Sequence, residues 1–154
     1  MKTNYVKIPL LLACLACLCI LVSCTNEDDS PKNNNIAEIQ SIVQSGTWRI
    51  TKFIDSDKDE TNHFTGYNFT FKSSGVLSAN NGTNNYDGIW SITDSDGDDD
   101  SQDDLDFNII FNLTNDFEDL NDDWEILSQS STKIELIDIS GGDGETDYLT
   151  FEKN

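Results

Sequence analysis

Alternating apolar and polar positions dominate the chain after Gly46. The clearest case is the run of Leu105, Phe107, Ile109 and Phe111 with mostly polar residues between them, which predicts a half-buried antiparallel strand. The same period of two recurs, and we predict eight strands near 46–54, 66–72, 75–80, 86–93, 105–113, 123–129, 132–139 and 147–152. In the first of them, Trp48, Ile50 and Ile54 are the expected apolar positions. Short turn-forming segments separate most of them, as in hairpins. The pattern therefore predicts an all-β, antiparallel, up-and-down sheet, whose closure into a barrel would remove its exposed edges.

A helical period precedes the strands. Its apolar residues, which recur at helical spacing, are Ile36, Ile39, Ile42 and Val43. Asn35 and Glu38 resemble a capping box, and Gly46 is a natural stop. We expect a short N-terminal helix that packs on one end of the sheet.

The N-terminus has the pattern of a secretion signal. Lys2 and Lys7 precede an apolar stretch that ends in Leu21-Val22-Ser23-Cys24. This run resembles the lipobox of bacterial lipoproteins, which implies that residues 1–23 are a signal peptide and that Cys24 is lipidated. Cleavage before Cys14 would leave too short an apolar core. At about 15 residues, the apolar stretch is also short for a membrane span.

Cysteine usage follows from this interpretation. Cys14, Cys17 and Cys19 would leave with the signal, and Cys24 would carry lipid. We therefore expect no disulfide, no cysteine-type zinc site and no thiol nucleophile in the mature chain.

The charge is strongly acidic. The chain has 29 Asp and Glu residues against 9 Lys and Arg, a net charge of -20, and every acid follows Cys24. Phosphate backbones and anionic lipid would be repelled. We expect no nucleic-acid partner, and contact with the membrane only through the anchor.

Residues 24–34 are expected to form the lipidated cysteine and a disordered acidic tether, and residues 35–154 the folded domain. Glu27-Asp28-Asp29 resembles the surface-export tag of Bacteroidota outer-membrane lipoproteins. The resemblance implies a protein anchored in the outer membrane and facing the cell surface. The alternative is a solvated linker without an export role.

Gly46-Thr47-Trp48 resembles the G-x-W that opens the first strand of lipocalins. A short helix, this tripeptide and eight hairpin-linked strands are similar to the lipocalin-like domains of small bacterial lipoproteins. The resemblance implies an up-and-down barrel with an apolar pocket. Lipocalins keep an arginine near the last strand that packs across the tryptophan, whereas this chain has Lys153 there. An open or two-sheet β fold stays an alternative.

The inward-facing aromatic residues are the candidate ligand-binding set. They are Trp48, Phe69, Phe71, Trp90, Phe107, Phe111, Trp124 and Phe151. Eight strands enclose an interior that side chains can nearly fill. These residues therefore either line a pocket for a small hydrophobic molecule or form a solid core.

Two acidic loops are candidates for weak calcium binding. Asp55, Asp57 and Asp59, and again Asp94, Asp96 and Asp98, place carboxylates at alternate positions as a calcium loop does. Neither loop completes an EF-hand, because an acid replaces the sixth-position glycine in both. Solvated loops without a metal are the alternative.

Nothing in the sequence names a reaction. The one histidine, His63, lies in a polar stretch that reads as a solvated loop, and no nucleophile elbow or phosphate loop occurs. We expect a non-enzymatic, lipid-anchored binding protein that carries a small hydrophobic ligand. The alternative is a surface interaction module with a filled barrel, whose acidic loops contact protein or glycan.

Overall fold

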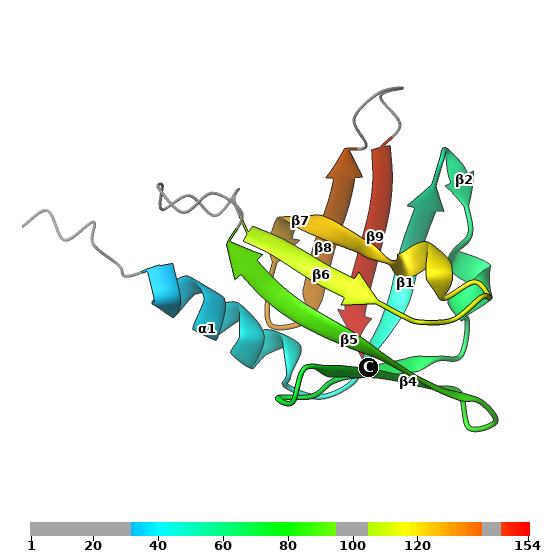
Figure 1. Ribbon diagram of the computed structural model, residues 1–154, viewed down its shortest axis with the longest axis horizontal. Helices are drawn as coiled ribbons and strands as arrows, with labels where there is room; N and C mark the ends of the chain where they lie inside the picture. Colours follow the sequence, from blue (N-terminus) through cyan, green and yellow to red (C-terminus); the bar gives the residue numbers. More distant parts are fainter. Residues whose placement is uncertain (1–31, 95–104, 140–145) are drawn as a thin grey trace, which may run out of the picture.

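The computed structural model describes residues 32–94, 105–139 and 146–154, with side chains from residue 36 onward. Figure 1 shows a single barrel with a helix beside it. Its elements are α1 (Lys32–Val43), β1 (Trp48–Asp55), β2 (Lys58–Asp59), η1 (Thr61–Phe64), β3 (Asn68–Phe71), β4 (Val76–Asn80), β5 (Asn85–Asp94), β6 (Leu105–Ile110), η3 (Glu118–Leu120), β7 (Asp122–Gln129), β8 (Lys133–Ile139) and β9 (Thr146–Lys153).

Eight antiparallel strands close the barrel in sequence order. Each of β3 to β8 pairs with the next strand, and β1 pairs with both β9 and β3. The two contacts of β1 are unequal, because it pairs with β9 at six positions and with β3 only at Trp48 and Phe69. The extra strand, β2, is a two-residue hairpin partner of β1. The predicted fold class is confirmed, and the open-sheet alternative is wrong.

The helix starts earlier than the sequence pattern predicts. It begins at Lys32, so Asn35 lies inside the helix and not at its N-cap. Ile39 and Val43 are fully buried, and the Trp48 indole donates a hydrogen bond to the Val43 carbonyl at 2.8 Å. Gly46, with a φ of +103°, then turns the chain into β1. None of the described helices is long and apolar enough to cross a membrane.

A β-bulge changes the alternation of β1. The sequence pattern predicts Ile54 on the inward face, but the structure buries Phe53 and leaves Ile54 half-buried. The register of β1 against β9 shifts between Ile50 and Lys52, and one extra residue moves every later side chain to the other face. The prediction for Ile54 was therefore wrong.

The sixth strand is shorter than predicted. β6 ends at Ile110, where the pattern predicts a strand to residue 113. Beyond it, the Asn121 side chain accepts a hydrogen bond from the Phe111 amide and donates one to the Phe111 carbonyl. An amide side chain thus satisfies backbone groups that a neighbouring strand would otherwise pair.

Candidate functional site

The barrel interior contains all eight predicted inward aromatic residues. Their exposed fractions are at most 5%: Trp48 0%, Phe69 0%, Phe71 1%, Trp90 5%, Phe107 0%, Phe111 1%, Trp124 1% and Phe151 0%. They come from six strands and from the residue after β6, so the side chains converge from around the barrel. Alternation in the sequence was enough to place them inside.

These rings pack against one another. The centroid of the Phe71 ring lies 5.4 Å from those of Trp90 and Phe151 and 5.6 Å from that of Phe107, all in edge-to-face geometry. Phe151 also meets Phe69 at 5.4 Å. Such distances are those of direct aromatic contact. The middle of the barrel is therefore occupied by side chains.

Three further phenylalanines, which sequence alternation missed, extend this core toward one end of the barrel. Phe53 follows the bulge, Phe64 lies in η1, and Phe117 precedes η3; each is at most 3% exposed. The Phe117 ring contacts five aromatic rings, which are Phe64, Tyr67, Phe69, Tyr86 and Phe111. Phe64 and Phe117 each stand alone in a polar segment, and this could have indicated their burial, because exposing such a side chain is costly.

The interior polar groups have partners within the protein. The indole N–H groups of Trp48, Trp90 and Trp124 donate to backbone carbonyls at 2.8, 3.0 and 3.2 Å. Among the described residues, no buried side-chain nitrogen or oxygen lacks a hydrogen bond. Ligand pockets usually present a few free polar groups that orient the ligand. The described core presents none.

The first predicted calcium loop does not assemble as expected. Asp57 lies in the β1–β2 turn with a φ of 63°, and Asp59 accepts a hydrogen bond from the Thr61 amide at 3.1 Å. Hydrogen bonds from Thr61 lower the pKa of Asp59. Asp55 instead gathers with Glu60 and Asp119, whose carboxylate oxygens lie within 4.8 Å of one another. Burial, and then the charges of Glu60 and Asp55, raise the pKa of Asp119.

These three acids could hold a cation. They differ from the predicted set because Glu60 follows β2 and Asp119 lies in η3, two elements that the sequence pattern did not predict. In the second loop, Asp94 ends β5, whereas Asp96 and Asp98 lie outside the described residues. Cys24 and residues 25–31 of the predicted tether also lie outside them, whereas residues 32–34, which were expected to be disordered, form the start of α1.

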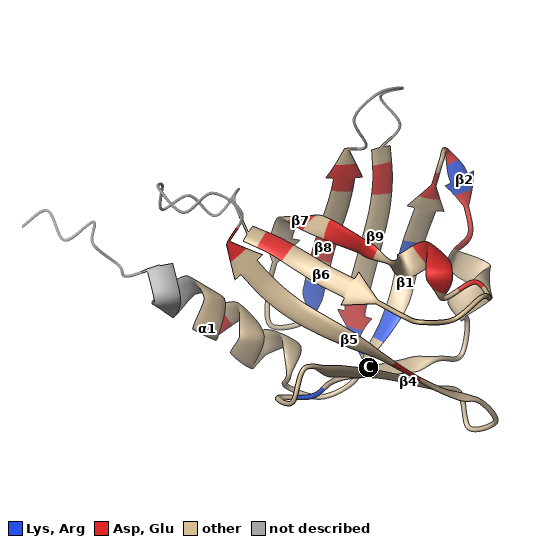
Figure 2. Ribbon diagram, in the orientation of Figure 1, with Lys and Arg blue, Asp and Glu red and all other residues tan. Residues whose placement is uncertain are grey.

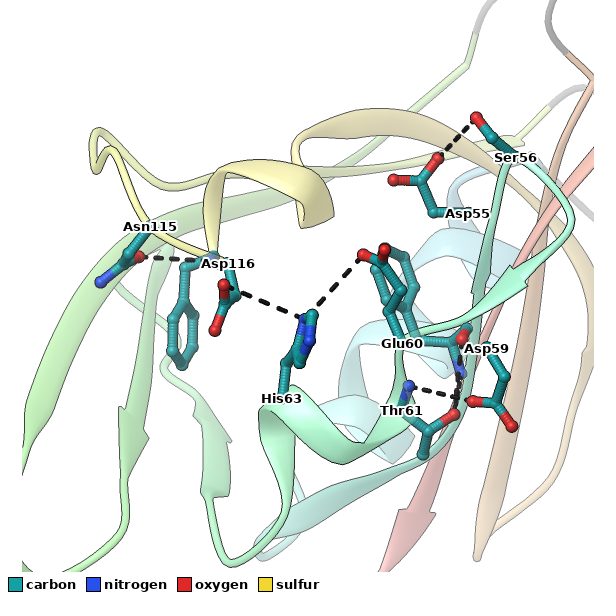
Figure 3. A network of polar contacts seen from close by, with 10 residues as sticks. Asp55, Ser56, Asp59, Glu60, Thr61, His63, Asn115 and Asp116 are labelled. Atoms are coloured by element: carbon teal, nitrogen blue, oxygen red, sulfur yellow. Dashed lines mark hydrogen bonds and ion pairs between the residues drawn. The ribbon is translucent and has the colours of Figure 1, made fainter.

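His63 is not a simple loop residue, because it lies in η1 between two carboxylates. Figure 3 shows its ring between Glu60 and Asp116, with Nδ1 at 3.9 Å from an oxygen of each. Thr61, also in η1, accepts a hydrogen bond from the Phe53 amide at 2.8 Å. The contacts link η1 to β1 and to the segment before η3.

The outer wall of the barrel has a shallow hollow of about 540 Å³ where β6 meets β7. Asn108, Ile110, Asn121, Asp122 and Asp123 line it. Burial raises the pKa of Asp122 to about 6, and the nearby charges of Asp138 and Asp123 add to the effect. Ionised Asp122 is therefore a source of instability at neutral pH.

We expect Asp122→Asn to stabilise the protein at pH 7. In the wild type, the folded pKa is raised above the unfolded one, so stability falls as pH rises from about 4 through about 6. Denaturant unfolding across this range should show the gain of the variant above pH 6 shrinking toward pH 4. The exposed Glu38→Gln is the control. A gain for Asp122→Asn that does not change with pH would contradict this origin.

No family model and no curated protein matches the sequence. A crystal structure of a DUF4847 family protein from Bacteroides vulgatus is similar, with a TM-score of 0.48 and 20% identity, over 75% of this chain and 97% of that chain.

Proposed function

We propose that this protein is a non-enzymatic binding module. It would be a membrane-anchored barrel whose interior is filled by its own side chains, and it would contact its partner through the outer surface of the barrel. The observation that carries the proposal is the aromatic packing of the interior. Phe71 alone contacts three rings from three other strands. A ligand inside would have to displace such contacts, whereas pockets for small molecules are commonly about 300–1,000 Å³ and largely pre-formed. Carriage of a small hydrophobic ligand is therefore the less supported function.

The proposal includes a lipid anchor on Cys24, an outer-membrane location and a lipocalin-like fold. The anchor and the location rest on the lipobox and the acidic tag alone. One contact supports the lipocalin likeness. Lys153 Nζ lies 5.4 Å from the centroid of the Trp48 ring, where lipocalins keep an arginine. A cation over an indole face is a favourable arrangement that lysine can also provide.

Weak calcium binding stays a prediction, now at Asp55, Glu60 and Asp119. Calcium in the millimolar range should raise the melting temperature of the wild type by about 2 °C. Asp119→Asn should lose this response, because it removes one carboxylate ligand and relieves the mutual repulsion. An unchanged wild-type melting temperature would leave the cluster as a solvated acidic surface.

A fluorescent apolar probe tests the proposed function. The uncharged N-phenyl-1-naphthylamine should show no saturable fluorescence increase with a soluble form that starts at Thr25, because the interior is filled. Detergent micelles serve as the positive control for the probe. Saturable one-to-one binding would favour carriage inside the barrel.

A further inference from the structure

The outer wall formed by β5, β6 and β7 has a charge unlike the rest of the barrel. The six charged residues of these strands are Asp87, Asp94, Asp106, Asp122, Asp123 and Glu125. The sequence has no lysine, arginine or histidine between Lys72 and Lys133. Figure 2 shows acidic residues and no basic ones on these three strands, whereas basic residues occur on β1, β2 and β8.

Two acids on the other side of the barrel have basic neighbours. Arg49 on β1 pairs with Glu152 on β9 at 3.2 Å, and Lys133 pairs with Glu135 on β8 at 2.5 Å. On the β5–β7 wall, the register places Asp106 opposite Glu125, and between β8 and β9 it likewise places Asp138 opposite Asp147. Like charges at directly opposed positions destabilise a sheet. A cationic partner bound to the β5–β7 wall would reduce the repulsion between its acids.

The same wall exposes apolar side chains beside the acids. Ile89 and Ile110 are cross-strand partners with exposed fractions of 56% and 49%. Ile110 also lines the hollow of about 540 Å³, together with Asp122 and Asp123. The surface thus combines a concave acidic area with an apolar edge. A binding segment that matches it would carry both positive charges and an apolar side chain.

We propose that the outer wall of β5–β7 binds a basic peptide segment of a partner protein, with its lysine or arginine side chains over the acids and an apolar side chain against Ile89 and Ile110. This inference rests on the proposed function, because it identifies the surface and the partner chemistry of the binding module. Charge complementarity selects the occupant, since anionic lipid and nucleic acid are repelled from this wall.

Calorimetric titration of the full-length lipidated protein in an uncharged detergent tests the inference. The probe is the hexapeptide Lys-Ile-Lys-Lys-Ile-Lys, with Lys-Ser-Lys-Lys-Ser-Lys as its apolar-deficient control and detergent alone as the blank. Asp123→Asn combined with Glu125→Gln should weaken binding about five- to tenfold. Glu38→Gln combined with Asp57→Asn removes the same charge from exposed positions off the wall and should change affinity less than about twofold. Ile110→Ser should reduce the preference for the isoleucine peptide.

Near-ultraviolet circular dichroism verifies that each variant is folded. Equal losses in the two double variants would overturn the inference, because binding would then reflect the diffuse negative charge of the whole protein. Absence of binding to the wild type would overturn it as well. Neither result touches the proposed function, which fails instead if the wild type takes up N-phenyl-1-naphthylamine with one-to-one saturation.

Discussion

Phe71→Ala should lower the free energy of unfolding by about 3–5 kcal/mol, the range for removal of a buried phenylalanine. Phe71 is 1% exposed and touches Trp90, Phe107 and Phe151 at the centre of the barrel. The closed sheet limits how far the surrounding strands can collapse into the space left behind. Chemical denaturation of the soluble form measures the loss.

Ile110→Ala is the matched control for the outside of the same barrel. Ile110 is 49% exposed, so its truncation should cost less than about 1 kcal/mol. The contrast between the two variants separates core packing from general sensitivity to apolar truncation. A loss below about 1 kcal/mol for Phe71→Ala would mean that the interior is loosely packed, and it would reopen the case for a ligand pocket.

Cys24→Ser should move the protein from the membrane to the soluble fraction. Lipid chains contribute about 0.8 kcal/mol for each buried CH₂, and two or more chains hold a protein almost permanently. The strongly acidic domain has no compensating attraction to an anionic surface. Membrane fractionation followed by intact-mass measurement reads out both the location and the lost lipid mass.

Cys19→Ser is the control for this experiment, because Cys19 lies inside the predicted signal peptide and should be absent from the mature protein. This variant should stay in the membrane with the wild-type lipid mass. Membrane retention of Cys24→Ser with an uncleaved N-terminus would point to a membrane-spanning anchor and would refute the lipobox interpretation.

The period of two predicted the strands well because burial on one face imposes alternation directly on the sequence. Phe107 and Phe151 were placed inside on this basis alone, and both are fully buried. The same rule failed at Ile54, where a bulge in β1 shifts the alternation to Phe53. The alternation of apolar and polar residues does not reveal this bulge, since the bulge depends on the register in which β1 pairs with β9.

The candidate site was predictable only in part, for a related reason. Asp55, Asp57 and Asp59 were grouped because they are close in sequence, but Asp57 lies in the β1–β2 turn and only Asp55 joins the acidic cluster. Asp119 joins Asp55 from a segment about 60 residues away, through the packing of η3. Contacts of this kind depend on tertiary structure, which residue spacing does not encode.

Native mass spectrometry of the protein extracted from its own cells tests the central claim, a barrel filled by its own side chains, most directly. After detergent removal in the gas phase, we expect the mass of the lipidated chain with no further apolar molecule in stoichiometric amount. An additional lipid-sized mass bound one to one, and retained when the anchor is cleaved from the domain, would contradict the filled barrel.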